Sequence, residues 1–194
     1  MTSKARLLRD IRKVSTRARA KVSQSFFKTG PGEYGEGDRF LGTAVPDLRK
    51  LSVKYEAMPL RDLSSLLKSR WHEERLLALL ILVRQYERGP QATRNAIYRL
   101  YLGHTRYINN WDLVDSSADA IVGAHLYEGD RALLHKLAQS RSIWERRIAI
   151  LASFHFIKKG EYEDALTITE LLLRDEHDLI HKAVGWMLRE VGKR

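Results

Sequence analysis

The chain has 194 residues, 44% of them hydrophobic and 30% charged, a composition typical of a folded protein and not of a disordered one. It carries 34 Lys and Arg against 24 Asp and Glu, and the net charge of +10 favours a polyanionic partner, either nucleic acid or an anionic membrane. The absence of cysteine excludes a disulfide framework, a thiol nucleophile and every Cys-ligated metal site.

Residues 4–24 are predicted to form one cationic amphipathic helix. Its apolar residues recur every three or four positions: Leu7, Leu8, Ile11, Val14, Ala18 and Val22. The opposite face carries Lys and Arg, with Asp10 as the only acid of the segment. An ordinary solvated face and a face that contacts phosphates fit this pattern equally well.

Residues 28–38 are the only long irregular stretch, because four glycines and a proline forbid a helix there. A nucleotide-binding loop is excluded, since the GxxxxGK[ST] pattern is absent and no hydrophobic strand precedes the stretch. We expect Phe26, Phe27 and Phe40 around the loop to pack it down. For Tyr34 the sequence leaves two roles open, packing or contact with a ligand.

From Pro46 onward every segment has helical periodicity, and no alternating strand pattern occurs. Pro46 suits a first helical position, and Pro59 and Gly89-Pro90 separate helices. The predicted helices span residues 46–56, 60–69, 72–88, 91–102, 110–122, 130–139, 143–158, 161–174 and 177–192. The predicted fold class is all-α.

A cation begins several of these apolar helices, at Arg75, Arg147 and Lys182. The helix start at Asn110-Trp111-Asp112 falls midway between the first two, which gives a period of roughly 35–40 residues with two helices per unit. This period predicts one domain over residues 1–194, an α-solenoid of HEAT-like helical repeats, curved and with a basic concave face. Side chains at corresponding repeat positions would gather on that face.

The helix that starts after Asn109-Asn110 carries the strongest functional candidates. Trp111 and Asp115 are four residues apart and therefore share one face of the helix. Asp112, in the first turn, fits an ordinary role opposite the helix dipole. An aromatic ring beside a carboxylate, on a polar face of a very basic protein, favours a functional role for the pair.

Two further helix starts place cations and tryptophans where free backbone amides also favour phosphate: Trp144-Glu145-Arg146-Arg147 and His181-Lys182 with Trp186. Two tryptophans that flank one carboxylate, with cations nearby, suit a substrate with an anionic backbone on which positive charge develops. The aromatic faces and the carboxylate would both attract that positive charge. His177 and His181 have the spacing of paired metal ligands, but the Glu after the first His and a third ligand are missing. We expect no metal and no cofactor. No serine lies in a nucleophile elbow.

Four motifs occur together and in a fixed order: Gly32–Gly42 with Val45–Arg49, Trp111–Asp115, Ile143–Leu151 and Ile180–Glu190. In this order, over nearly the whole chain, the sequence resembles the AlkD-like DNA alkylation-repair glycosylases, a family of HEAT-like repeat enzymes. The resemblance implies a concave face that grips double-stranded DNA. It also implies excision of cationic alkylated bases, such as 3-methyladenine and 7-methylguanine, without drawing the base into a pocket.

The resemblance also implies roles for particular residues. Asp115 corresponds to the catalytic carboxylate, and Trp111 and Trp186 correspond to the aromatic rings against the sugar of the modified nucleotide. Because no lysine nucleophile motif is evident, we expect a monofunctional enzyme that leaves an abasic site and acts as a monomer. The candidate DNA-binding residues are Arg147, Arg146, Lys182, Tyr34 and Arg75.

Two other functions fit the same pattern. A helical-repeat protein could bind distorted or branched DNA without excising bases. It could also serve as a protein-binding scaffold, but the net charge of +10 argues against the scaffold. The family usually continues for another helix pair, so we expect this C-terminal pair to be absent or truncated. No apolar run approaches the ~20 residues of a membrane span and no signal segment follows Met1. We therefore expect a cytoplasmic protein with no membrane partner.

Overall fold

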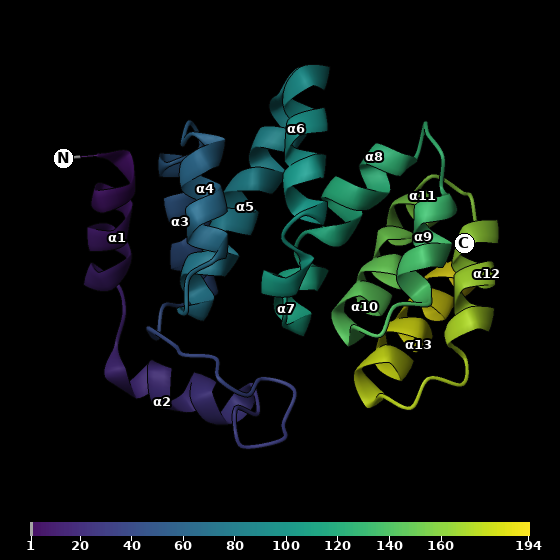
Figure 1. Ribbon diagram of the computed structural model, residues 1–194, viewed down its shortest axis with the longest axis horizontal. Coiled ribbons are helices and arrows are strands. Elements are labelled where there is room, and N and C mark those ends of the chain that lie inside the picture. The colour runs from purple at the N-terminus through teal and green to yellow at the C-terminus, as the bar shows by residue number, and fades with distance from the viewer. Residues whose placement is uncertain (1) are drawn as a thin grey trace.

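The structure is a computed structural model that describes residues 2–194, and Figure 1 shows helices joined by turns and one long loop. Within these residues only an isolated bridge between Arg39 and Trp71 has strand-like pairing. The first helices are α1 (Ser3–Lys13), α2 (Arg17–Phe26), α3 (Val45–Lys54), α4 (Leu60–Leu67), α5 (His72–Arg88) and α6 (Gln91–Leu102). They are followed by the 3₁₀ turn η1 (Thr105–Tyr107), α7 (Trp111–Asp115), the π-helix η2 (Asp119–Gly123), α8 (Ala124–Leu126), α9 (Ala132–Ala138), α10 (Ile143–Ala152), α11 (Phe154–Lys158), α12 (Glu163–Leu172) and α13 (Asp178–Gly192).

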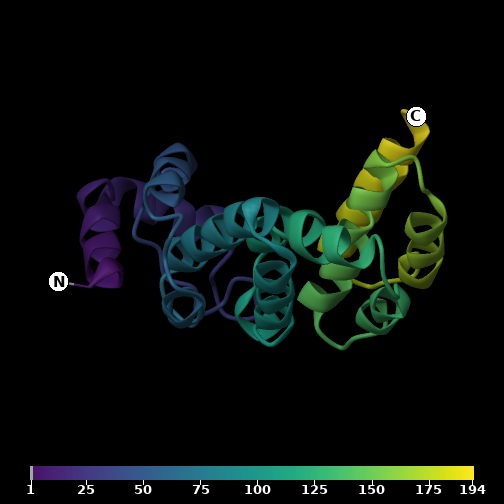
Figure 2. The ribbon, with the colours of Figure 1, turned by 90° about the horizontal axis from the view of Figure 1, so that it is seen from above.

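Helices that are neighbours in the chain pack side by side, and the molecule is an elongated row. Helix α5 packs against α3, α4 and α6, and α10 packs against α9, α12 and α13. Figure 2 shows the row from above, with the two termini at opposite ends. The predicted all-α solenoid of helical repeats is confirmed.

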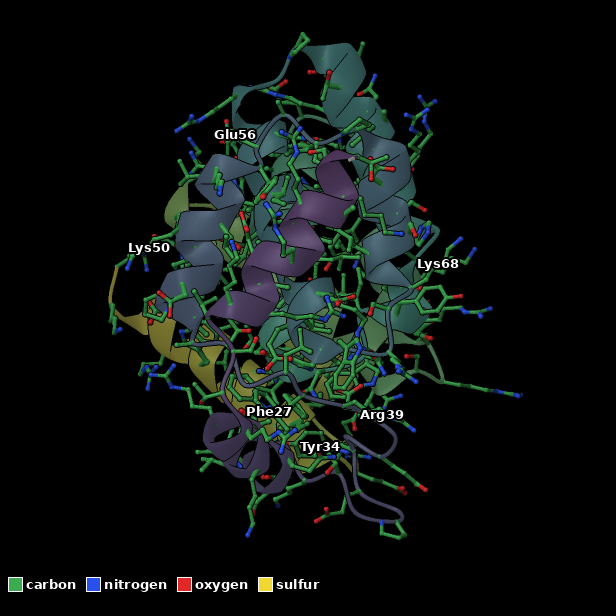
Figure 3. All side chains as sticks on the ribbon, turned by 90° about the vertical axis from the view of Figure 1, so that its left-hand side faces the viewer. Phe27, Tyr34, Arg39, Lys50, Glu56 and Lys68 are labelled. Atoms are coloured by element: carbon green, nitrogen blue, oxygen red, sulfur yellow. The ribbon has the colours of Figure 1, made fainter. Side chains whose placement is uncertain are left out.

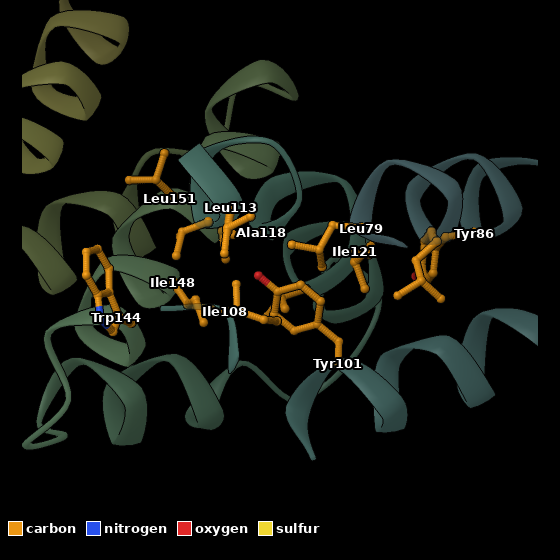
Figure 4. Packing of buried hydrophobic residues seen from close by; sticks show 14 of the residues in the cluster. Leu79, Tyr86, Tyr101, Ile108, Leu113, Ala118, Ile121, Trp144, Ile148 and Leu151 are labelled. Atoms are coloured by element: carbon orange, nitrogen blue, oxygen red, sulfur yellow. The ribbon is translucent and has the colours of Figure 1, made fainter. Parts of the chain in front are cut away.

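One apolar core follows the row from end to end. It begins with Leu7 and Ile11 in α1 and extends to Met187 in α13. Figure 4 shows its middle part, around the side chains of Leu79, Tyr101, Ile108, Leu113, Ala118, Ile121 and Ile148. Each repeat buries its apolar face against the next one, as a solenoid requires.

The prediction of a single helix over residues 4–24 is wrong, because the chain turns after Lys13. Thr16 begins a second helix: its hydroxyl accepts a hydrogen bond from Arg19 N at 3.3 Å, and its own amide donates to Gly42 O at 3.0 Å. Helix α2 thereby leaves the row and lies below it in Figure 1, beside the long loop. None of its residues is buried.

Serine side chains interrupt two further predicted helices, 110–122 and 143–158. Ser117 Oγ donates a hydrogen bond to Leu113 O at 2.6 Å, and Ser153 makes the same kind of bond to the preceding turn of its own helix at 2.7 Å. Such bonds compete with the helical backbone pattern. The first segment is therefore divided into α7 and the π-helix η2, and the second into α10 and α11.

Candidate functional site

Asp115, the last residue of α7, forms a two-pronged ion pair with Arg147 of α10. Arg147 Nε and Nη2 each donate to one carboxylate oxygen of Asp115 at 2.8 Å, and Arg147 Nη1 donates to the backbone oxygen of Leu179 in α13. The Arg147 side chain is 6% exposed and the Asp115 side chain 19% exposed. Three helices far apart in the sequence therefore meet here, and they hold the carboxylate in one orientation while part of it stays open to solvent.

Two opposing effects set the protonation of Asp115. Burial raises the pKa of the Asp115 carboxyl group above its ordinary value, and the Arg147 guanidinium beside it offsets only part of this rise. Because both oxygens accept hydrogen bonds from arginine, the ionised form is the one that matches this geometry. The pair gives the site a fixed carboxylate rather than a mobile one.

Trp111 lies one turn before Asp115 in α7 and borders the same hollow, which has a volume of about 460 Å³. Its ring stacks on Phe27 with centroids 5.4 Å apart, and Phe27 stacks in turn on Phe40 at 5.0 Å. The expected packing of Phe27 and Phe40 is confirmed. Phe26 also meets the rings of Phe27 and Trp111 edge-on, with centroids 5.1 and 6.0 Å apart, but it stays 63% exposed and lines the hollow.

Helix α5 begins with four consecutive buried polar residues, 72–75, which we call the α5 polar cluster. In this cluster His72 lies between two carboxylates, with Nδ1 3.1 Å from Asp38 Oδ2 in the loop and Nε2 2.7 Å from Asp112 Oδ2 in α7. Burial alone would lower the pKa of His72, but Asp112 and Asp38 outweigh it and raise that pKa to about 9. The protonated ring can donate from both nitrogens and so fastens the loop to α7.

The two glutamates of the α5 polar cluster bind the segments that precede α5. Glu73 accepts hydrogen bonds from the backbone amides of residues 41–43, at 2.8, 2.7 and 3.2 Å. Glu74 accepts one from Arg12 Nη2 at 3.1 Å. The first turn of α5 thus holds the end of the loop and the end of α1 in place, which fixes the loop relative to the row of helices.

Arg75, which the sequence suggested for DNA binding, is a buried member of the same cluster. Its side chain is 5% exposed, with Nη2 donating to Asp38 Oδ1 at 2.6 Å and Nη1 to Ser69 O at 2.9 Å. A guanidinium held in this way cannot reach a phosphate, so the structure does not support direct DNA contact by Arg75. Asp112 likewise does more than oppose the helix dipole, because it is the partner of His72.

Two other candidate cations already have acidic partners. Arg146 Nε donates at 2.6 Å to Oδ2 of Asp175, a residue that precedes α13 in the chain. Lys182 Nζ lies 2.7 Å from Asp178 Oδ2, but both of these side chains are largely exposed. Lys182 can therefore exchange its partner for a phosphate at little cost.

The two remaining aromatic candidates lie in different surroundings. Tyr34 meets the ring of Trp144 edge-on, with centroids 6.2 Å apart, and borders a cleft that it shares with Trp111. Trp186 packs on Phe154 at 5.7 Å and borders neither hollow that Trp111 lines. The structure thus brings Trp111, Asp115, Arg147, Lys182 and Tyr34 together around two adjoining hollows and leaves Trp186 farther along α13.

The fold and site define a basic helical-repeat protein in which a buried arginine holds a partly exposed carboxylate beside aromatic rings. Residues 7–194 match the family model described as "DNA alkylation repair enzyme", and the chain belongs to this family. A similar solved structure is a "predicted DNA alkylation repair enzyme from Enterococcus faecalis", with a TM-score of 0.68 and 18% identity over 92% of this chain and 84% of that chain. This likeness supports the fold. A search of curated proteins found no match.

In the part of the chain that the structure describes, no helix combines the length and the apolar character needed to cross a bilayer.

Proposed function

We propose that the protein is a monofunctional DNA glycosylase. It would hydrolyse the N-glycosidic bond of cationic alkylated bases, of the 3-methyladenine and 7-methylguanine type, in duplex DNA and leave an abasic site. The observation that carries the proposal is the Asp115 carboxylate, fixed by Arg147 and one helical turn from Trp111. Membership of the family and the net charge of +10 support DNA as the substrate.

The proposed chemistry follows from where charge develops in the reaction. Alkylation of a ring nitrogen makes the base cationic and a good leaving group, so no general acid is needed to protonate it. As the bond breaks, the sugar gains positive charge, which Asp115 stabilises while it orients the attacking water. The face of Trp111 adds cation–π attraction.

Arg147 has a positioning role in this proposal. Its two bonds to Asp115 fix the carboxylate before substrate arrives, so little reorganisation is needed during the reaction. Its third bond, to Leu179 O, ties this geometry to α13. Lys182 and Trp186 lie one turn apart on α13, and we propose that they meet the DNA backbone and sugar.

The test measures release of free 7-methylguanine from a defined methylated duplex by the wild type and by Asp115→Asn. We expect the variant to lose about 100-fold or more in rate, because one preorganised electrostatic partner is worth ~3 kcal/mol in such a transition state. Its affinity for DNA should be equal or slightly higher, since a charge that repels phosphate is removed. Asp119→Asn is the matched control: it makes the same change four residues later, at a carboxylate paired with Lys158.

Each outcome of this test separates two functions. Release by the wild type and by Asp119→Asn, but not by Asp115→Asn, supports the glycosylase. Release by none of the proteins, combined with salt-dependent DNA binding, would move the assignment to a non-catalytic protein that recognises distorted or branched DNA. Equal release by all three would mean that another residue performs the chemistry.

A further inference from the structure

The positive charge of the protein is concentrated at one end of the chain. Residues 1–70 contain 16 Lys and Arg against 7 Asp and Glu, a net charge of +9, whereas residues 71–194 contain 18 against 17, a net charge of +1. Because the two termini lie at opposite ends of the row of helices (Figure 2), this division of the sequence is also a division in space. A polyanion that lies along the row therefore meets nearly all of the net charge at the N-terminal end.

The cations of α1 and α2 differ in what they contact. In α1, Arg12 pairs with Glu74 at 3.1 Å and Lys13 Nζ lies 3.6 Å from Asp10 Oδ1. Helix α2 contains no acidic residue, and none of its side chains is buried. Its three cations are exposed and have no acidic partner within the described residues: Arg17, Arg19 and Lys21. They remain available to an anion from outside the protein.

Helix α2 is held at both ends, although it leaves the row. Near its start, Gly42 has a φ of +82°, and a Cβ there would lie 2.1 Å from Thr16 O, so this close approach requires glycine. Just after its last residue, the ring of Phe27 stacks on Trp111. Binding would not have to order α2, which favours affinity.

The cations of α2 lead away from the hollow of Asp115. Phe26, the last residue of α2, lines this hollow together with Arg49 of α3, an exposed side chain with no acidic partner among the residues described. Figure 3 looks along the row from its N-terminal end and shows α2 below α3, with Lys50 projecting from α3 away from the row. We call the following four residues the α2–α3 track: Arg17, Arg19, Lys21 and Arg49. The track extends from the hollow toward the N-terminal end of the molecule.

The opposite side of the hollow has a different electrostatic character. The cations of α10, α11 and α13 that border the adjoining hollows have acidic partners: Arg147 with Asp115, Lys158 with Asp119 and Lys182 with Asp178. Each of these pairs has no net charge. They can make contacts at the site itself, but they add little long-range attraction for DNA that continues past it.

We propose that the enzyme holds the flanking duplex on one side of the modified base only, along the α2–α3 track, and that duplex on the other side is dispensable. This inference rests on the proposed function, because Asp115 decides where the modified nucleotide lies. Asp115 has to face the sugar of one strand, so the duplex binds in one direction. The track therefore holds either the 5′ flank or the 3′ flank, and not both.

The test compares two duplexes that the enzyme does not cut, each with a tetrahydrofuran abasic site. Helix α2 has ten residues and is about 15 Å long, the length of about four base pairs. One duplex therefore has about three base pairs on the 5′ side of the abasic site and about fifteen on the 3′ side, and the other has the reverse. The shorter flank cannot follow the whole track.

Two triple variants accompany the wild type. The α2 variant is Arg17→Gln, Arg19→Gln and Lys21→Gln together, since glutamine is a good helix former. The matched control replaces three other exposed cations that have no acidic partner in the described part of the chain and do not line the hollow of Asp115: Arg99→Gln, Arg106→Gln and Lys136→Gln. Circular dichroism should show wild-type helix content for both variants.

We expect the wild type to bind one of the two duplexes about tenfold more tightly at ~0.1 M salt. On that duplex, the slope of log affinity against log salt should be steeper by about 0.9 for each phosphate contact. The α2 variant should lose the preference, and its slope on the favoured duplex should fall by about 2 to 3. The control variant should keep both.

Base release separates binding from chemistry. When 7-methylguanine replaces tetrahydrofuran in the two duplexes, the wild type should show the same preference at limiting enzyme. It should show none at saturating enzyme, because the track acts in binding and not in the chemical step.

Equal affinity of the wild type for the two duplexes would overturn the inference. A preference that the α2 variant retains, or that the control variant also loses, would do the same. Failure of the proposed function looks different, because the wild type would then release no 7-methylguanine from a duplex with two long flanks. Failure of the inference alone leaves that release intact and makes it equal on the two asymmetric duplexes.

Discussion

The two carboxylates of α7 face different regions of the molecule and meet different kinds of partner. Asp112 meets His72 in the buried α5 polar cluster, on the N-terminal side, whereas Asp115 meets Arg147 on the C-terminal side. The first pair depends on a histidine whose charge can be removed by pH, and the second on an arginine that stays charged. The difference teaches that the partner, and not the residue type, separates a carboxylate that holds the fold together from one placed to act on a substrate.

The largest effect on stability is expected from Arg147→Ala, which removes the C-terminal partner of α7. The substitution leaves Asp115 partly buried without its cation, and breaking such a pair typically costs about 3–5 kcal/mol. Arg147→Lys should lose less stability but still reduce base excision, because a lysine cannot hold both oxygens of Asp115. Urea unfolding measures the first effect. An unchanged unfolding midpoint for Arg147→Ala would show that the stability of α7 does not depend on the ion pair between Asp115 and Arg147.

The N-terminal side is probed by pH. Because the folded protein raises the pKa of His72 from 6.5 to about 9, its contribution to stability is complete below pH 6.5 and is lost as the pH rises through about 9. The loss should be on the order of 3 kcal/mol. Unfolding free energies from pH 6 to 10 should therefore converge for the wild type and His72→Gln at alkaline pH.

A matched histidine provides the control for this pH effect. Burial lowers the pKa of His125, so His125→Gln should leave the alkaline loss of stability intact. If the wild type and His72→Gln keep a constant difference up to pH 10, then His72 is held by packing and not by its two carboxylates.

The smallest effect is expected at the exposed pair of Lys182 and Asp178, which shows what an ion pair does when neither side is buried. Lys182→Ala should leave the melting temperature unchanged within error, since exposed pairs contribute little. If Lys182 contacts a phosphate, the slope of log affinity against log salt should fall by about 0.9. Titrations of DNA binding at several salt concentrations measure this slope, and an unchanged slope would remove Lys182 from the interface.

Much of the fold could be predicted from the sequence, because helical periodicity and the repeat of cation-headed helices are local or regular signals. The predicted helices that correspond to α3–α6, α9, α12 and α13 agree with the structure to within a few residues. The pairing of Trp111 with Asp115 also followed from spacing alone, since residues four apart share a face of a helix.

The partners of these residues could not be predicted. His72 contacts residues 34 and 40 positions away, and no periodic pattern marks such contacts. The run of four polar residues at the start of the buried helix α5 was a usable signal, because buried polar groups require partners. The helix breaks at Ser117 and Ser153 depend on hydrogen bonds from the serine side chains to the backbone. Their free energy is close to that of the helical bonds with which they compete, so the sequence does not predict which of the two forms.

The α5 polar cluster also has a consequence during synthesis of the chain. Arg12 and the backbone amides of residues 41–43 find their partners 62 and about 30 positions later, in the first turn of α5. Translation adds roughly 5–20 residues each second, so seconds pass between the synthesis of these segments and that of the residues that bind them. A nascent chain arrested before His72 should therefore be cut readily by protease in α1. One arrested well beyond α5 should be protected there.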